Sequence, residues 1–571
     1  MDNSSQLKND STPAIYNKYK KLVLNTSSEL KFTKTKSTFL CSEAKKRSKE
    51  NISKYFSLGN NISSKNKSEI ISSLKVVYHD KTFEKEIYSI SSYNEFFSIL
   101  VPLKEISHIP LIEEPLYNDD NIIFDSDFEE GNLRMAIEIT KNKEYDLIMR
   151  PETNSKKLYT YFFFSIVIKS NEDNSENNNY IKLNIINKPK DKNFYNGQCP
   201  VLMFDTSINK WTRNTFNVYT INNGIKNPNL KNEFKSYFSL TFCFYYKPNV
   251  KYYFASCYPY TYTQLRLYLN TLNKNIYKNI IKFGEAGQTF NKNKIPYIVI
   301  TNFNCTEEEL SEKKCVLITG RIHSGETVSS YAVQGLIDFL VNIKNPVSNY
   351  LRDKLIFKII PMLNIDGVIF GNYRLNLLGK DMNRLWLPNI PFNSDECDKS
   401  SLYINNIIDI IKKTLNNRNI FLYCDFHGHS GKQNFFLYGC AKEGNENYHK
   451  KFMDIFAKKN NIFSLNDCVH KIMPKKMNTC RALLKNVFSV DLSYCLEASI
   501  FSYMIKDEIN NKKIYPFTIE KYKQIGMDFC QSLFDLINPQ NDELFDNEID
   551  IDSNKDNNKE NNISNNNINI I

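Results

Sequence analysis

The chain contains no run of 18 or more apolar residues, and this absence argues against a membrane-spanning helix. Its first twenty residues also have no apolar core segment of the kind found in secretory signals, so we expect neither such a signal nor a membrane partner. No two of its 13 cysteines are spaced as CxxC. An odd number of scattered cysteines is typical of reduced thiols, which predicts a cytoplasmic protein without a disulfide framework or a Cys-ligated zinc site.

The chain has fewer acidic than basic residues, 63 against 74, and carries a formal net charge of +11. The segment from residue 541 onward is the exception, because it holds eight acidic residues and only two lysines. A basic body can attract nucleic acid, anionic lipid or an acidic polypeptide, although a solvated lysine-rich surface is the commoner cause of such a charge. No nucleic-acid-binding motif and no G-x-x-x-x-G-K-[ST] phosphate loop is present, so we expect no nucleic-acid partner.

Composition divides the chain into four expected regions. These are a Ser/Lys/Asn-rich, partly disordered N-terminal region (1–119), a β-rich domain (120–257), an α/β domain (258–537) and a disordered acidic and Asn-rich tail (538–571). In the β-rich region, apolar runs at 160–168, 180–187 and 238–246 are separated by Asn, Lys and Gly, which predicts an antiparallel β-sandwich or barrel.

The region from 258 alternates between apolar strands and amphipathic helices. Its expected strands are 314–320, 354–363 and 420–428, and its expected helices are 326–342, 402–414, 445–459 and 518–537. Alternation of this kind predicts an α/β fold with a mostly parallel or mixed sheet.

Three possible metal ligands lie at the ends of two expected strands. His323 and Glu326 occur in GRIHSGET, directly after strand 314–320, and a spacing of three lets an imidazole and a carboxylate converge on one ion. His427 lies at the end of strand 420–428, and ligand sites in open α/β sheets lie beyond the carboxyl ends of strands. Two histidines and one glutamate are the ligand set of catalytic zinc in metallopeptidases, so the sequence predicts a hydrolytic zinc site.

Four further residues suit the other needs of a peptidase. Arg374, Asn383 and Arg384 follow strand 354–363, and arginine offers a planar fork that matches a carboxylate. Glu497 lies near apolar residues in SYCLEAS, and an apolar environment could shift its pKa to a value suited to proton transfer. Each of these side chains, taken alone, is more often a surface cation or a salt-bridged carboxylate.

Together these segments resemble the cytosolic carboxypeptidase family, also called ATP/GTP-binding-protein-like carboxypeptidases. In the α/β domain the resemblance is carried by GRIHSGET, YCDFHGHS, SYCLEAS and PMLNIDGVIFGNYRLNLLGKDMNRLW (361–386). Upstream it is carried by FDSDFEEGNL (124–133), EYDLIMRPETN (144–154) and YPYTYTQL (258–265). The resemblance covers about residues 120–537 and implies a zinc carboxypeptidase domain preceded by a β-sandwich domain. The sequence departs from the family at Ser324 and Ile365, where the family usually has proline.

The resemblance implies a role for each matching residue. His323, Glu326 and His427 would hold one zinc ion per chain, Glu497 would be the general base, and Arg374 would stabilise the oxyanion. Asn383 and Arg384 would bind the α-carboxylate of the substrate, Asp425 would orient a ligand, and His429 would be a neighbouring pocket group. Arg481, in a looser match and with Lys475 and Lys476 nearby, would hold the side-chain carboxylate of a terminal glutamate.

The resemblance also implies glutamates as the leaving residues, above all those of polyglutamylated tubulin on microtubules. We therefore expect a cytoplasmic and cytoskeleton-associated deglutamylase. Two alternatives stay open at this point: a carboxypeptidase of the same fold with another C-terminal specificity, and a catalytically silent cytoskeletal adaptor.

Overall fold

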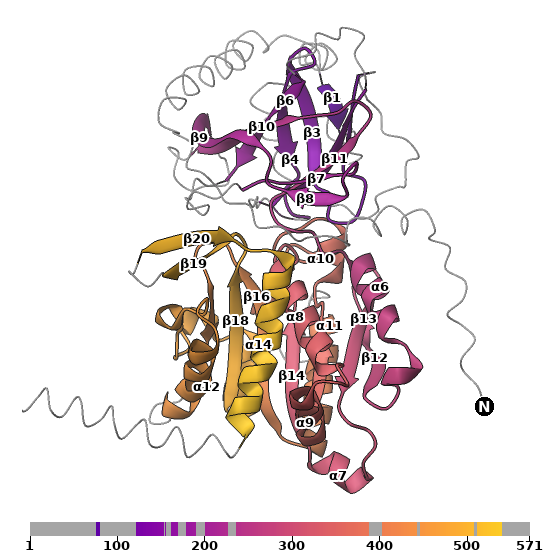
Figure 1. Ribbon diagram of the computed structural model, residues 1–571, viewed down its shortest axis with the longest axis vertical. Helices are drawn as coiled ribbons and strands as arrows, with labels where there is room; N and C mark the ends of the chain where they lie inside the picture. Colours follow the sequence, from indigo (N-terminus) through magenta and orange to yellow (C-terminus); the bar gives the residue numbers. More distant parts are fainter. Residues whose placement is uncertain are drawn as a thin grey trace, which may run out of the picture.

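The computed structural model describes residues 76–79, 121–153, 155, 161–169, 179–189, 200–226, 236–386, 402–441, 446–506 and 511–538. Within these residues the chain forms a β-sandwich above an α/β domain (Figure 1). The predicted fold class is therefore confirmed. The tail from 539 and nearly all of the first 119 residues, for which disorder is predicted, lie outside the described residues.

The sandwich consists of two sheets that enclose an apolar core. The six-stranded sheet contains, in spatial order, β1 (Val76–His79), β3 (Leu133–Thr140), β4 (Glu144–Met149), β6 (Tyr180–Lys188), β10 (Ser236–Tyr245) and β9 (Phe216–Lys226). The five-stranded sheet contains β2 (Ile122–Asp125), β5 (Phe163–Ile168), β11 (Lys251–Ala255), β7 (Leu202–Asp205) and β8 (Lys210–Thr212). All pairs are antiparallel except β4 with β6, and β1 comes from the segment predicted as the N-terminal region.

The α/β domain is built on a mixed seven-stranded sheet. Its strands, in spatial order, are β12 (Ile281–Gln288), β13 (Lys294–Ile300), β15 (Leu355–Ile360), β14 (Lys314–Gly320), β16 (Ile420–His429), β18 (Leu492–Ser499) and β17 (Phe435–Tyr438). The four strands from β15 to β18 are parallel, and the outer ones are antiparallel. Burial along β14 and β16 is nearly continuous, as expected for central strands covered on both faces.

Helices cover this sheet and close its ends. They are α6 (Tyr262–Leu272), α7 (Glu307–Glu312), α8 (Thr327–Leu340), α9 (Pro346–Lys354), α10 (Ile365–Ile369), α11 (Leu402–Asn417), α12 (Glu446–Lys459), α13 (Cys480–Asn486) and α14 (Ile519–Ile537). Short 3₁₀ turns occur at Asn275–Tyr277, Met382–Arg384, Leu465–Asp467 and Pro474–Lys476, and a hairpin is formed by β19 (Ser502–Lys506) and β20 (Lys512–Pro516). Helix α8 contacts the sheet at β14, β16 and β18, and α14 packs along α8.

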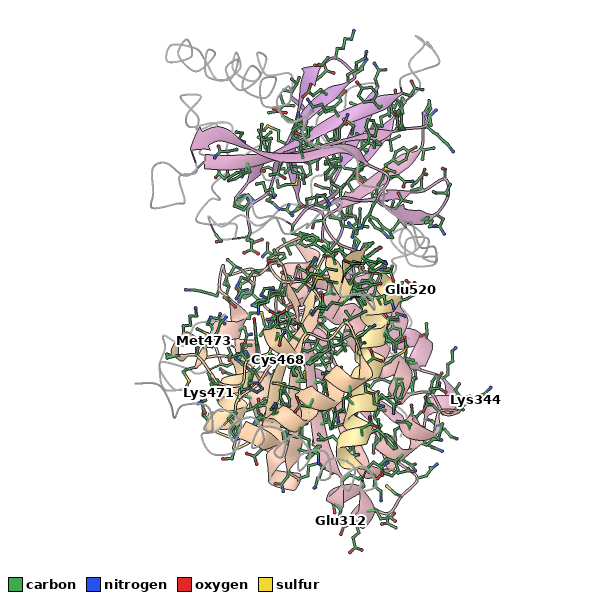
Figure 2. The ribbon with its side chains drawn as sticks, turned by 60° about the vertical axis from the view of Figure 1, so that its left-hand side comes forward. Glu312, Lys344, Cys468, Lys471, Met473 and Glu520 are labelled. Atoms are coloured by element: carbon green, nitrogen blue, oxygen red, sulfur yellow. The ribbon has the colours of Figure 1, made fainter. Side chains whose placement is uncertain are left out.

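The two domains meet through polar side chains at the carboxyl ends of the parallel strands. A buried ion pair joins Glu130 of the sandwich to Arg321, whose Nη2 lies 2.6 Å from the carboxylate. Glu129 accepts hydrogen bonds from the backbone N–H and the hydroxyl of Thr263 at the start of α6. Figure 2 shows side chains filling this junction. The sandwich is therefore attached to the edge of the α/β sheet at which the predicted site residues lie.

Two expectations about the whole chain can also be checked. None of the helices in the described part is both long and apolar enough to cross a membrane. The ten cysteines within the described residues are free thiols, as the sequence predicts.

Candidate active site

The strand ends of the α/β sheet carry the three predicted metal ligands. Strand β14 ends at Gly320, and the loop that follows carries His323 and then Glu326, which is the N-cap residue of α8. An N-cap side chain usually accepts a hydrogen bond from its own helix, but the carboxylate of Glu326 makes none of these bonds and turns to the histidines instead. The local capping preference is thus overridden at a position that the site requires.

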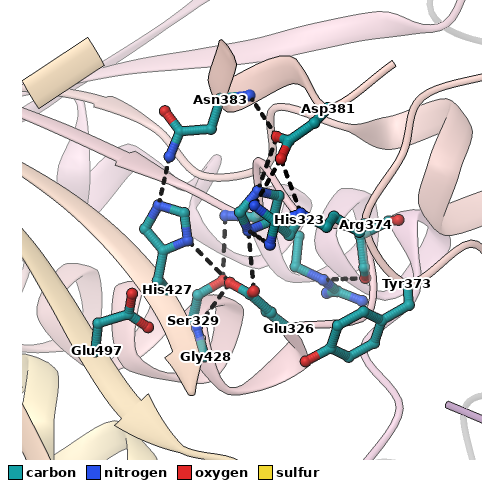
Figure 3. A network of polar contacts seen from close by, with 12 residues as sticks. His323, Glu326, Ser329, Tyr373, Arg374, Asp381, Asn383, His427, Gly428 and Glu497 are labelled. Carbon is teal, nitrogen blue, oxygen red and sulfur yellow. Dashed lines mark hydrogen bonds and ion pairs between the residues drawn. The ribbon is translucent and has the colours of Figure 1, made fainter. Parts of the chain in front are cut away.

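The three side chains direct one donor atom each at a common point. The Nδ1 atoms of His323 and His427 both lie 2.9 Å from the Glu326 carboxylate, one at each oxygen (Figure 3). Their ligand atoms lie within 4.8 Å of one another, and all three residues are buried. The donor set fits zinc: two imidazoles and a carboxylate that leave a coordination position open are what catalytic zinc uses.

Carboxylates hold the second nitrogen of each ligand histidine. Asp425 lies 2.7 Å from Nε2 of His427 and also accepts a hydrogen bond from the hydroxyl of Thr319. Asp381 lies 3.2 Å from Nε2 of His323. A carboxylate in this place fixes the ring and leaves Nδ1 as the donor toward a metal. The proximity predicted for Asp425 is therefore observed, whereas Asp381 is a partner that the sequence analysis missed.

Electrostatics within the cluster are strong because its members are buried. Burial alone would raise the pKa of Glu326, but the charges and hydrogen bonds of the two histidines hold it well below its usual value. Burial would also lower the pKa of His427, and the charge of Asp425 outweighs this effect and raises it. A carboxylate that stays ionised between two imidazoles is suited to a divalent cation.

Glu497 lies beside the ligands because of strand pairing. In the parallel ladder of β16 and β18 it is the partner of His427, so both side chains emerge on the same side of the sheet (Figure 3). Burial raises its pKa to about 7; the charge of His427 lowers it, and that of Glu326 raises it further. A carboxyl with a pKa near neutrality is suited to exchange protons at physiological pH.

Arg374 reaches the same site from the segment after β15. Its guanidinium pairs with Asp381, with Nε at 2.8 Å and Nη2 at 2.6 Å, and its Nη1 lies 3.5 Å from Nδ1 of His323. Burial would raise the pKa of Asp381, but the hydrogen bond with His323 and the charge of Arg374 lower it. Asp381 thus connects a metal ligand to the cation that the sequence assigns to the oxyanion.

The residues assigned to the terminal carboxylate lie close by. The amide nitrogen of Asn383 lies 3.2 Å from Nε2 of His427, and its oxygen accepts a hydrogen bond from the backbone N–H of Cys480. Arg384 is partly exposed, and its Nη1 donates to the backbone oxygen of Asn383. Burial and the charge of Arg374 lower the pKa of Arg384, whereas Asp381 raises it. Two arginines are therefore brought together around Asp381.

Other predicted residues have different surroundings. Arg481 is buried; its Nη1 donates to the backbone oxygen of Gly439 at 2.5 Å, and its guanidinium lies over the ring of Tyr438. His429 accepts hydrogen bonds at Nδ1 from the backbone N–H groups of Gly431 and Lys432, so it caps a turn. Neither arrangement tests a role in substrate binding, which stays a prediction for Arg481.

A different cation, Lys476, lies near the reactive groups. The charges of Arg384, Arg374 and Glu497 all act on its amine, and burial, the largest effect, lowers its pKa. It lies in the 3₁₀ turn Pro474–Lys476, close in sequence to Arg481. In the sequence, Lys476 is indicated only by its position near other basic residues, Lys475 and Arg481.

The chain is similar to a known protein family and to several known proteins. Residues 266–500 match a family model described as "Zinc carboxypeptidase". The chain is 33% identical to cytosolic carboxypeptidase 6 of Homo sapiens, and the aligned region covers 73% of this chain and 80% of that relative. It is 32% identical to cytosolic carboxypeptidase 2 of Homo sapiens and 30% identical to cytosolic carboxypeptidase 3 of Mus musculus, but spans only 45% and 42% of their lengths.

Solved structures support the fold. The model matches the crystal structure of a metallo-carboxypeptidase from Burkholderia cenocepacia with a TM-score of 0.56 at 17% identity, over 73% of this chain and 99% of that one. A metallo-carboxypeptidase from Pseudomonas aeruginosa, solved in complex with (2-guanidinoethylmercapto)succinic acid, matches with a TM-score of 0.54 at 16% identity, over the same shares of both chains. At these identities the likeness concerns the fold alone.

Proposed function

Because this chain belongs to the cytosolic carboxypeptidases within the zinc carboxypeptidase family, we propose that it is a zinc-dependent carboxypeptidase that releases C-terminal glutamates from polyglutamylated proteins such as tubulin. The observation that supports this most directly is the convergence of His323, Glu326 and His427 beside Glu497. The printed names of the relatives describe cytosolic proteins, and we propose the same compartment for this one.

The three converging residues would hold one zinc ion per chain. Zinc supplies a Lewis acid that polarises a carbonyl oxygen and makes water more acidic. Asp425 and Asp381 fix the histidine rings so that both Nδ1 atoms stay directed at the ion.

Glu497 would act as the general base and later as the general acid. Its raised pKa lets it take a proton from the attacking water and return it to the leaving amine. It stands opposite His427 in the ladder, so water and substrate at the metal would lie within its reach.

Arginines would bind the two oxygen-bearing groups of the substrate. Arg374, next to His323, would donate to the oxygen of the scissile carbonyl as negative charge develops there. Arg384, with Asn383, would bind the terminal carboxylate in a planar fork and so set cleavage one residue from the end.

The charge around the site favours an acidic substrate. Arg374, Arg384 and Lys476 lie close enough for their charges to influence one another. Clustered cations attract anionic peptides and disfavour a lysine or arginine at the C-terminus. We assign the contact with the glutamate side chain to Lys476, whose amine is influenced by the charges of Arg384 and Arg374.

The test is a release assay with purified full-length protein. Glutamylated tubulin and synthetic peptides ending in Glu, Lys or Phe are incubated with it, and the released amino acids are quantified. We expect glutamate release that a chelator abolishes, and a loss of about a hundredfold or more in Glu497→Gln, since a general base contributes at least that much.

His323→Ala should also be inactive, and Glu312→Gln should behave like the wild type. Glu312 is exposed on α7, at the end of the domain away from the sandwich (Figure 2). Dominant release of Lys or Phe would refute the acidic specificity. Full, chelator-sensitive turnover by Glu497→Gln would refute the general base.

A further inference from the structure

One carboxyl group of the sandwich is bound by three successive backbone amides of the catalytic domain. Glu152 follows β4 in the segment RPET (150–153) and is 4% exposed. Its Oε1 accepts hydrogen bonds from the N–H groups of Tyr373, at 2.7 Å, of Leu375, at 3.2 Å, and of Arg374, which lies between them. The proposed mechanism gives this glutamate no role.

These three amides belong to a segment that is neither helix nor strand. Their N–H groups are therefore not bonded within a helix or a strand ladder. A buried N–H group without an acceptor is costly, so this segment would rearrange if the carboxyl group were removed. Glu152 thus determines the backbone conformation at residues 373–375.

The same segment is in contact with the candidate active site on both of its sides. The side chain of Arg374 pairs with Asp381 and approaches His323 (Figure 3). The backbone oxygen of Tyr373 accepts a hydrogen bond from the N–H of Gly325, at 2.6 Å, in the loop between the first two metal ligands. A shift of this backbone would therefore be transmitted directly to the guanidinium.

We propose that Glu152 is a positioning residue for peptide hydrolysis, which holds the backbone of residues 373–375 so that Arg374 is directed at the scissile carbonyl. The inference rests on the proposed function of the site. It gives the β-sandwich a part in catalysis, because one of its side chains sets the geometry of the oxyanion-stabilising group.

Glu129 offers a matched control from the same domain. Its carboxylate also crosses the junction and accepts a backbone N–H, but this N–H is that of Thr263, the second residue of α6. Loss of either glutamate removes an interdomain carboxyl group. Only the loss of Glu152 should affect the arginine.

The test is a double-mutant cycle measured by kcat and KM on a glutamate-ending peptide. Glu152→Ala should lower kcat between about tenfold and a hundredfold, as displacement of a catalytic group by about 1 Å does, with bound zinc unchanged. In an Arg374→Ala background the same substitution should change kcat less than about threefold, because the group it positions is gone. Glu152→Gln, which keeps an oxygen acceptor, should retain most of the activity, and Glu129→Ala should leave kcat unchanged in both backgrounds.

Equal loss of kcat from Glu152→Ala with and without Arg374 would overturn the proposal, because it would show a merely structural role. A second readout does not depend on activity. Amide hydrogen exchange at residues 373–375 should become faster in Glu152→Ala and stay unchanged in Glu129→Ala; unchanged exchange in Glu152→Ala would also overturn it. An inactive wild type with this exchange difference would refute the proposed function and leave the structural part of the inference standing.

Discussion

At the scale of single residues, the site is organised by carboxyl groups as much as by the residues that would touch zinc or substrate. Asp425, Asp381 and Glu152 each hold a functional side chain or its backbone in place. Their partners differ, but the physical role is the same, because an oxygen acceptor at a fixed point limits where a ring or a guanidinium can turn. The functional groups are therefore positioned before a substrate arrives.

We expect Asp425→Asn to weaken zinc binding by between about tenfold and a hundredfold, the usual effect of losing a carboxylate that supports a ligand histidine. The asparagine can still accept a hydrogen bond from His427 but no longer adds negative charge behind the ring. The measurement is competition for zinc with a chelator of known affinity. Asp353→Asn is the control, since Asp353 is exposed and pairs only with Asn302 among the described residues. Equal zinc affinity in both variants would contradict this role.

Sequence reasoning identified the residues of the predicted metal site but missed the contacts of Asp381 and Glu152, although both lie in segments that carry the family resemblance. His323, Glu326, His427 and Glu497 all lie in short strings at strand ends, and the structure brings them together. The hydrogen-bond donors to Glu152 lie more than 200 residues away in the chain. Nothing near Glu152 in the sequence shows that its carboxyl oxygen will accept hydrogen bonds from a loop of another domain.

At the scale of elements, the packing of α8 against α14 depends on two glycines. A Cβ atom on Gly335 would lie 2.0 Å from the backbone oxygen of Lys523, and one on Gly526 would lie 1.9 Å from that of Ala332. Backbone atoms cannot move aside as side-chain ends can, so both helices would have to separate. The N-cap residue of α8 is the predicted metal ligand Glu326, which connects this packing to the candidate site.

Gly335→Ala should therefore destabilise the protein by roughly 1–3 kcal/mol, the cost of overpacking, even though alanine is the better helix former. The measurement is the free energy of unfolding in denaturant. Gly284→Ala serves as the control, because the nearest atom to its added methyl group would be a ring carbon of Tyr297 at 3.3 Å, which can rotate. A variant Gly335→Ala as stable as the wild type would show that the helices tolerate separation.

Elements with strong periodicity were predicted closely and those with mixed patterns were not. Strand β14 has the predicted bounds, and α12 and α14 begin within one residue of them, because continuous apolar runs and amphipathic stretches leave few alternatives. Strands β12 and β13 were not predicted. Several positions of β12 are exposed, and its sequence does not alternate between apolar and polar residues. Its strand conformation therefore depends on hydrogen bonding to the neighbouring strand.

At the scale of the whole molecule, a buried ion pair joins the two domains. The guanidinium of Arg321 bonds to Glu130 and also to the backbone oxygens of Ser324 and Tyr260. Arg321 has a left-handed backbone with φ of 57°, directly after β14, so one residue turns the chain toward the ligand loop and anchors it to the sandwich.

Glu130→Ala should lower the free energy of unfolding by about 3–5 kcal/mol, because a charge left buried without its partner is costly. The control is Glu285→Ala, which removes an exposed ion pair with Lys294, whose amine lies 3.5 Å from the carboxylate. This variant should change the free energy of unfolding by less than about 1 kcal/mol. Denaturant unfolding of both variants gives the comparison. Similar losses in both would mean that the buried pair contributes no more than a surface one.

The pairing of β16 with β18 runs without a shift from Leu422 and Leu492 to His429 and Ser499. The spacing between His427 and Glu497 is therefore set by the backbone hydrogen bonds of two paired strands, and it does not depend on the length of the chain between Tyr438 and Leu492. We expect an insertion in that connection to leave the register of the two residues unchanged. Deletion of a single residue inside either strand would turn one of the two side chains to the opposite face.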